Sequence, residues 1–314
     1  MSVPEPGAMR VLERSPDGAA LAVEFRDMPE AMVAALRQTI MSDVPSAALH
    51  WVTVAENSGG VSDQQLSFVL GTVDLRVDPA KMEPLAPSYA LHFLKDNTRV
   101  RQLPVLGAAE QRCILAFRLE VQCHWDAVAR CVANQTVTAG DLVWQPFGDQ
   151  LQHFGAEGVR VADPEQVITR LFPGQRIELE AWAVLGTGHT HIKFSPVSTC
   201  YFNLKAEVRL QPAPEVDDIE SLDRALIDVC PRGVFGRDAR TGALAVLDES
   251  RCDFCDACMQ SPQHAKRVHV RPRANHYWLH INGKGRLPAA QILLKATELL
   301  SARTRQLAAE SELD

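Results

Sequence analysis

The stretch that decides the fold is DMPEAMVAALRQTIMSDVP, residues 27–45. Apolar side chains recur in it every four residues, the spacing of one helix face, at Met28, Met32, Leu36 and Ile40. Asp27, with Glu30 three residues later, supplies the start signal of a helix. Pro45 ends it, because the residue before a proline is disfavoured in the helical region. The pattern leaves two interpretations open: a helix inside one domain's core, or a helix that crosses an equivalent helix of another chain.

Length and composition indicate a globular protein. The chain has 314 residues, 46% of them hydrophobic, enough for one large or two medium domains. No apolar run approaches the ~18 residues that cross a membrane, and the start of the sequence has proline and acid where a secretion signal needs a basic start and an apolar centre. We therefore expect an intracellular protein whose eight cysteines form no disulfide framework.

The charge is unevenly placed along the chain. A net charge of −7 argues against wholesale nucleic-acid binding, yet residues 257–297 contain seven Lys or Arg and no Asp or Glu. Such a segment fits phosphate, an acidic partner protein or simply a solvated surface.

Strands and helices of mixed α/β type are expected at both chain ends, with β-strands between them. Near the ends we expect strands at 21–25, 48–54 and 275–281, a short helix starting at Ser62, and a long helix at 288–307. Short strands with Gly and Pro turns follow Cys113 and occupy 136–144, 175–185 and 201–210. The sequence predicts an α+β fold: a discontinuous α/β domain from residues 1–72 and 212–314, with a mainly-β domain inserted at 73–211.

The densest chemical pattern is a set of four cysteines. Cys252, Cys255 and Cys258 are spaced by two residues each, and Cys230 precedes Pro231 upstream. A Cys-x2-Cys-x2-Cys run with a separate Cys-Pro resembles ferredoxin usage. Four thiolates equally suit tetrahedral zinc, with His264 as a substitute ligand, although zinc sites more often split into two pairs. An iron–sulfur cluster, zinc and unligated thiols all remain open.

Other motifs carry less. His189 and His191 have no third ligand close in sequence, and Cys123, His124 and Cys131 fit ordinary strand residues. No glycine-rich segment has the strand-to-helix setting of a phosphate loop. Nothing in the chain reads as an active site.

Several collinear blocks resemble one family. LRQTIMSDVPSAALHWV (36–52) and ENSGGVSDQQLSFVLGTVDL (56–75) resemble the N-terminal signature of the α-like subunits of multisubunit RNA polymerases. LVWQPFGDQ (142–150), residues 171–202 and CPRGVF (230–235) are similar to the α-like subunit shared by polymerases I and III, and HYWLHINGKGRLPAAQILLKATELL (276–300) matches the closing strand and helix. The polymerase II third-largest subunit, the archaeal D subunit and the bacterial α N-terminal domain are relatives. Residues 1–20 and 76–135 are not covered.

The resemblance implies a non-catalytic scaffold subunit of a DNA-dependent RNA polymerase, a nucleotidyltransferase complex used in transcription. Its discontinuous domain would be a dimerisation domain that pairs with a smaller α-like subunit and nucleates binding of the two largest, catalytic subunits. The subunit would contact DNA and RNA only through the complex, and it would not contact a membrane. The implied dimer interface comprises Met32, Leu36, Arg37, Ile40, Ile292, Ala296, Leu299 and Leu300. Contacts to the second-largest subunit would come from Asn57, Asp63, His191 and Lys193.

The resemblance also bears on the metal and on localisation. Archaeal D relatives carry the cysteine set matched here by Cys230, Cys252, Cys255 and Cys258, and some bind an iron–sulfur cluster there; several eukaryotic relatives have lost it. This chain departs from the family at Gln38 and Gln64, and residues 76–112 contain no Cys for the zinc loop of polymerase II relatives. Localisation would be nuclear in a eukaryote, cytoplasmic in an archaeon, and the virion or host cell for a virus.

Two alternatives belong to other classes. An iron–sulfur electron carrier would use the ferredoxin-like cysteines, but no second cofactor motif accompanies them. A stand-alone nucleic-acid-binding module would use the basic 257–297 segment, and would show steep salt dependence.

Overall fold

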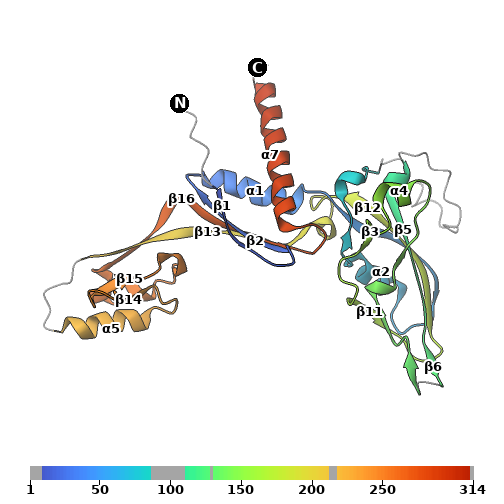
Figure 1. The fold of residues 1–314 in the computed structure, drawn as a ribbon, viewed down its shortest axis with the longest axis horizontal. Helices are drawn as coiled ribbons and strands as arrows, with labels where there is room; N and C mark the ends of the chain where they lie inside the picture. Colours follow the sequence, from blue (N-terminus) through green and yellow to red (C-terminus); the bar gives the residue numbers. More distant parts are fainter. Residues whose placement is uncertain (1–8, 86–109, 128–129, 212–217, 312–314) are drawn as a thin grey trace. The chain divides into compact units, whose positions relative to one another are not determined.

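The computed structural model describes residues 9–85, 110–127, 130–211 and 218–311 (Figure 1). Helices and strands both contribute heavily, which confirms the α+β class. The helices are α1 (Glu30–Ser42), α2 (Asp63–Gly71), α4 (Gln150–Phe154), α5 (Ile219–Val229), α6 (Pro262–Ala265) and α7 (Ala289–Ser311). The longer strands are β1 (Met9–Arg14), β2 (Ala20–Arg26), β3 (Ser46–Asn57), β5 (Ile114–Gln122), β12 (Arg176–Gly186), β13 (Val197–Leu210) and β16 (Val268–Gly283). The short strands are β4 (Leu75–Arg76), β6 (His124–Asp126), β7 (Cys131–Ala133), β8 (Thr136–Thr138), β9 (Val143–Trp144), β10 (Arg160–Val161), β11 (Val167–Arg170), β14 (Phe235–Arg237) and β15 (Leu244–Val246). Among the described residues no helix is both long and apolar enough to span a membrane.

The chain divides into two compact units, each drawn from separate stretches of sequence. The described residues of Met1–Leu12, Ala22–Ala34 and Tyr201–His280 form unit 1, and those of Glu13–Leu21, Ala35–Cys200 and Ile281–Asp314 form unit 2. The predicted insertion of one domain into another, with its boundaries, is not tested by this division and stays a prediction.

Unit 1 holds most of a sheet and a smaller cysteine-containing module. The sheet has the strand order β1-β2-β16-β13, so a strand from near the start of the chain lies beside one from near its end. The module consists of α5, the β14–β15 hairpin and α6, in which Phe235 pairs with Val246. Its apolar core includes one of the cysteines, and two more pack against it. The core comprises Ala206, Val208, Leu226, Val234, Phe235, Cys258 and Val268, and Cys230 and Cys252 pack against it.

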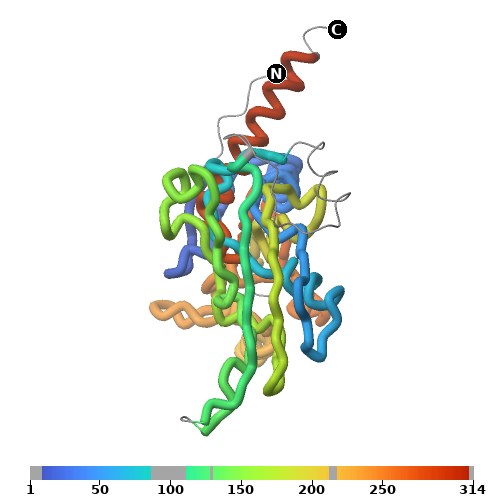
Figure 2. The backbone as a smooth tube through the Cα atoms, turned by 90° about the vertical axis from the view of Figure 1, so that its right-hand side faces the viewer, coloured from blue at the N-terminus to red at the C-terminus, as the bar shows by residue number. Residues whose placement is uncertain are grey.

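Unit 2 is built on an antiparallel sheet of order β3-β12-β5-β9. Figure 2 shows β5 and β12 running side by side along this sheet. Side chains on a strand alternate between its two faces, and here Leu115, Phe117 and Leu119 of β5 enter one core while Ile114 and Ala116 enter another. The sheet is therefore covered on both faces at the start of β5, whereas from Arg118 on the strand alternates between buried and exposed residues.

Most predicted elements are confirmed, with two differences. The stretch 136–144 is not one strand: β8 and β9 are separated by the 3-10 turn Ala139–Asp141. β16 has 16 residues and begins at Val268, well before the predicted 275–281. Its first half contains Pro272 and is rich in polar residues, which argues against a strand when only the sequence is known. The segment 212–220, which its prolines and acidic residues predict as a linker, lies largely outside the described residues.

Candidate functional site

The eight positions expected at a dimer interface fall into two groups. Leu36, Ile40, Ile292 and Ala296 are buried within this chain, at 4%, 0%, 0% and 0% exposure. They belong to the chain's own core; the structure contains no second chain, so their place at a dimer interface stays a prediction. Met32 is 52% exposed, and Leu299 and Leu300 are half-buried. Arg37 donates from Nε to the carbonyl of Cys200 at 3.1 Å, so its guanidinium fixes the chain's own backbone.

The second half of α7 has no cover from the described part of the chain. Ala302–Glu310 are all exposed, although the helix continues unbroken to Ser311 (Figure 1). Leu307 is 57% exposed there, and Arg303 makes only a long ion pair with Asp43, at 3.8 Å.

A buried arginine just before α7 was not singled out in the sequence. Arg286 is 2% exposed, and its Nε donates to Asp74 Oδ1 at 2.6 Å. A second guanidinium nitrogen donates to Ser46 Oγ at 2.8 Å and to the carbonyl of Ala47 at 3.1 Å. This residue fastens the turn that starts α7 to β3. Its position after Gly285 did not indicate that it is buried, because the sequence shows that the segment is basic but does not show which of its cations is buried.

The first pair expected to face the second-largest subunit closes a turn. The amide of Asn57 donates to Asp63 Oδ1 at 2.7 Å and to the carbonyl of Val61 at 2.9 Å, while its Oδ1 accepts from Gly59 N. Ser62 caps α2 by accepting from Gln65 N, as the capping pattern predicted. The structure brings Asn57 and Asp63 together but contains no second protein, so their contact role stays a prediction.

The second pair lies in the turn Ile192–Phe194. His191 caps the turn, its Nδ1 accepting from Lys193 N at 3.1 Å. The ammonium of Lys193 donates to the carbonyl of Leu49 at 2.9 Å and lies 5.2 Å from the Phe194 ring centroid. Burial lowers the pKa of Lys193, and the nearby charge of Arg286 lowers it further. His189 is exposed, and no metal pair with His191 is indicated among the described residues.

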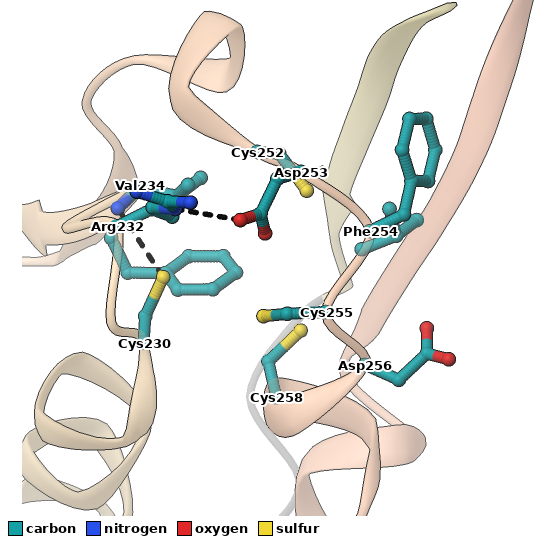
Figure 3. A pocket seen from close by; sticks show the side chains of 11 residues that line it. Cys230, Arg232, Val234, Cys252, Asp253, Phe254, Cys255, Asp256 and Cys258 are labelled. Carbon is teal, nitrogen blue, oxygen red and sulfur yellow. Dashed lines mark hydrogen bonds and ion pairs between the residues drawn. The ribbon is translucent and has the colours of Figure 1, made fainter. Parts of the chain in front are cut away.

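The four cysteines line a single small pocket in unit 1, as their spacing predicted. Cys230 lies at the end of α5, and Figure 3 shows the sulfurs of Cys255 and Cys258 turned toward the same space from the opposite loop. Val234 N donates to the Cys230 sulfur at 3.4 Å, and Arg232 bonds Asp253 at 2.6 Å across the pocket rim. The space left among these side chains is about 10 Å³, room for one water-sized sphere.

The loop that carries three of the thiols is held in a strained conformation. Phe254 and Asp256 have φ of 60° and 58°, in the left-handed region, which is unusual for a bulky residue such as phenylalanine. Such residues cost on the order of 1–3 kcal/mol each and persist where the surroundings demand them. The two residues stand directly before and directly after Cys255, so the loop turns tightly on both sides of this thiol.

The thiols influence one another, but they are not assembled as metal ligands. Burial, with a further contribution from the charge of Cys252, raises the pKa of the Cys258 thiol to about 11. Burial likewise raises the pKa of Cys252. Among the described residues no three His, Cys, Asp or Glu side chains are grouped closely enough to hold a metal ion. The alternative ligand His264 is buried but does not line the cysteine pocket. The donor chemistry therefore fits a metal, provided that the thiols rotate toward one another.

Unit 1 also contains a buried charged cluster that sequence reasoning missed. Glu24 is 5% exposed and accepts from His276 at 2.8 Å, from Trp278 Nε1 at 3.4 Å and from Arg26 at 3.0 Å. Burial by itself would raise the pKa of Glu24, but these hydrogen bonds outweigh it and bring the pKa to about 2. The only signal was a charge at an inward position of an alternating strand, which single-sequence reasoning passed over.

Comparison with curated proteins finds that the chain is similar, over most of its length, to proteins named as subunits of DNA-directed RNA polymerases, which confirms the resemblance drawn from the sequence. No family model matches the chain. It is 29% identical over 269 residues to the DNA-directed RNA polymerases I and III subunit rpac1 of Dictyostelium discoideum, covering 84% of this chain and 71% of that protein. It is 25% identical to the corresponding subunit RPAC1 of Saccharomyces cerevisiae, covering 87% of this chain and 78% of that protein. The DNA-directed RNA polymerases II, IV and V subunit 3 of Arabidopsis thaliana is 24% identical, with 89% and 84% covered.

Proposed function

We propose that this chain is a non-catalytic assembly subunit of a DNA-dependent RNA polymerase. It pairs with a smaller α-like subunit, and the heterodimer is the platform on which the second-largest and largest subunits assemble. The observation that supports this most is its similarity over most of its length to proteins named as RNA polymerase subunits. These relatives are eukaryotic, so a eukaryotic source would place the protein in the nucleus.

The pairing surface that we propose is centred on α7. Leu299 and Leu300 are half-buried and Leu307 is exposed, so an apolar stripe continues past the point where this chain's own core ends. A partner helix that covered the stripe would remove this surface from water, at about 25 cal/mol per Å² of apolar area. Obligate interfaces of this kind bury on the order of 2,000 Å² or more, so α7 would be one part of a larger contact.

The buried positions are poor probes of this surface. An aspartate at Leu36 or Ile40 would place a charge inside the chain's own core, which destabilises the fold whether or not a partner binds. Loss of co-purification by such variants would therefore not distinguish an interface from a core. An exposed position on α7 avoids this difficulty.

The test uses Leu307→Asp, with Gln306→Asp as its matched control. Both residues are exposed, so both variants add the same charge to the same helix turn at little cost to folding. We expect Leu307→Asp to reduce recovery of the smaller α-like subunit from the purified native assembly at least tenfold, because an unpaired charge would be buried at the interface. Gln306→Asp should leave recovery unchanged. Equal recovery with both variants would refute the α7 interface, and mass spectrometry of a solitary monomer in the native extract would refute the proposed function.

We further propose that Cys230, Cys252, Cys255 and Cys258 hold a metal, either an iron–sulfur cluster or zinc. The support is their shared pocket, the hydrogen bond to the Cys230 sulfur and the strained loop that turns the thiols inward. A bound metal would pin this loop and hold the cysteines as thiolates. A single ion fits the present space, whereas an iron–sulfur cluster would require the loop to open. Elemental analysis of the native assembly for iron and zinc decides between them, and absence of both would refute the metal.

The alternatives from other classes gain no support. No relative reported above is named as an electron carrier or as a stand-alone nucleic-acid-binding protein.

A further inference from the structure

A second, larger cavity of unit 1 lies beside the cysteine loop. It has a volume of about 800 Å³ and is lined by β13, by β16 and by the loop around Ser250–Phe254. Aromatic side chains form much of its wall: Tyr201 stacks on His280 with ring centroids 4.8 Å apart, and Trp278 lies next along the strand. No residue of α7 lines this cavity, so it is distinct from the proposed helix interface.

Lys205 is the unusual member of this cavity. It is 8% exposed, and its ammonium has no hydrogen-bond partner in the described part of the protein. Its Nζ lies 2.8 Å from the centroid of the Trp278 ring, so its one close interaction is with an aromatic face. A buried ammonium without an acceptor is costly. Burial lowers the pKa of Lys205 to about 8, with Glu24, Asp248 and Glu249 partly opposing the shift, so it is largely charged at neutral pH.

The other charges of the cavity are already paired. Arg232 is bonded to Asp253 at 2.6 Å and Arg251 lies 3.3 Å from Asp248. The lining holds three cations and one carboxylate, Asp253, while Glu24, Asp248 and Glu249 act on Lys205 from outside the lining. Among the described residues, Lys205 is the one of these three cations that lacks a polar partner.

We propose that this cavity binds an extended acidic segment of a partner protein. One Asp or Glu carboxylate of that segment accepts a hydrogen bond from Lys205, and a neighbouring apolar or aromatic side chain packs on the wall formed by Trp278 and His280. A carboxylate fits better than a phosphate, because a phosphate binds best to free guanidinium forks and both arginines here are engaged. The cavity is open enough to admit a peptide backbone as well as a single side chain.

This inference adds a partner contact that the proposed function does not contain, and it does not depend on the α7 interface. It requires only that an acidic chain reaches unit 1. A failure of Leu307→Asp to disturb assembly would therefore leave it standing.

The test measures binding of a defined probe to the full-length chain. The probe is a fluorescein-labelled decapeptide with two glutamates flanked by phenylalanine and leucine, and its control has glutamine at both acidic positions. We expect fluorescence anisotropy to show that the full-length chain binds the glutamate peptide at least tenfold more tightly than the glutamine peptide. Lys205→Met should remove this preference, whereas Lys266→Met, an exposed lysine of the same unit, should keep it.

Folding is controlled by a second variant and a second measurement. Tyr201 is 42% exposed and lines the cavity, so Tyr201→Ala should fold normally. It should still weaken binding of the glutamate peptide several-fold. Lys205→Met should leave the unfolding midpoint unchanged or raise it, since it removes an ammonium without an acceptor. Equal binding of both peptides, no effect of either variant, or displacement of the peptide by inorganic phosphate or single-stranded DNA would each overturn the assignment.

Discussion

Replacing Arg286 by methionine tests whether the start of α7 is held by a buried ion pair. The change keeps most of the side-chain volume and removes three hydrogen bonds, to Asp74 at 2.6 Å, to Ser46 at 2.8 Å and to Ala47 O at 3.1 Å. Removing one partner of a buried pair costs about 3–5 kcal/mol, because the remaining charge stays unpaired. Asp74 is 23% exposed and recovers some water, so we expect the lower end, about 3 kcal/mol.

Urea unfolding followed by tryptophan fluorescence reports this change well. Four of the five tryptophans, at 51, 125, 144 and 182, lie in the unit that contains Arg286. With a slope of roughly 2–3 kcal/mol per molar urea, the midpoint of that unit should fall by about 1 M. Arg303→Met is the control: Arg303 is 71% exposed and 3.8 Å from Asp43, so its loss should cost less than about 0.5 kcal/mol. Adding Asp74→Asn to Arg286→Met should recover part of the loss. Equal midpoints for Arg286→Met and Arg303→Met would refute the reasoning.

Three further predictions concern other parts of the chain. Ser62→Ala should cost about 1 kcal/mol in the same urea titration, because it removes the cap of α2, while Ser62→Asp should cost little. Glu24 has a pKa of about 2 in the folded protein against an ordinary value of 4.5, so the stabilisation that it contributes is complete above pH 4.5 and is lost as the pH falls toward 2. This loss, up to about 3 kcal/mol in the free energy of unfolding, should be absent in Glu24→Gln. Cys258→Ser should abolish whatever iron or zinc elemental analysis finds in the wild-type assembly, whereas Cys131→Ser, an exposed thiol outside the pocket, should leave the metal content unchanged.

The sequence was most informative where one local rule decided the outcome. Helix α1 followed from a four-residue apolar repeat, and α2 from the capping residues Ser62 and Gln65. The cysteine pocket followed from spacing alone, because thiols three residues apart on a tight loop have few other ways to point. These features depend on residues that are close together in the sequence, so the sequence alone is enough to predict them.

The sequence was least informative about which side of an element is buried against what. Arg286, Glu24 and Lys205 are charged residues whose burial depends on partners 73 to 252 positions away in the sequence. Periodicity cannot show which cations of the basic 257–297 segment are buried. Arg267 is buried and donates a hydrogen bond to Asp223 at 2.6 Å, whereas the adjacent Lys266 is exposed. Long-range pairing of this kind becomes visible only when the strands are placed.

Helix α7 shows how one periodic pattern can serve two purposes. In its first half the stripe at Ile292 and Ala296 is fully buried in this chain, and in its second half the stripe at Leu307 faces solvent. The exposed part, Ala302–Glu310, makes about two and a half turns, and it extends a helix that its packed first half has already nucleated. Leu307 gains no packing in these turns from the described residues of the chain. A second surface that covered Leu307 would add hydrophobic stabilisation that the monomer lacks, and this exposed leucine, rather than the repeat itself, is the physical argument for a partner.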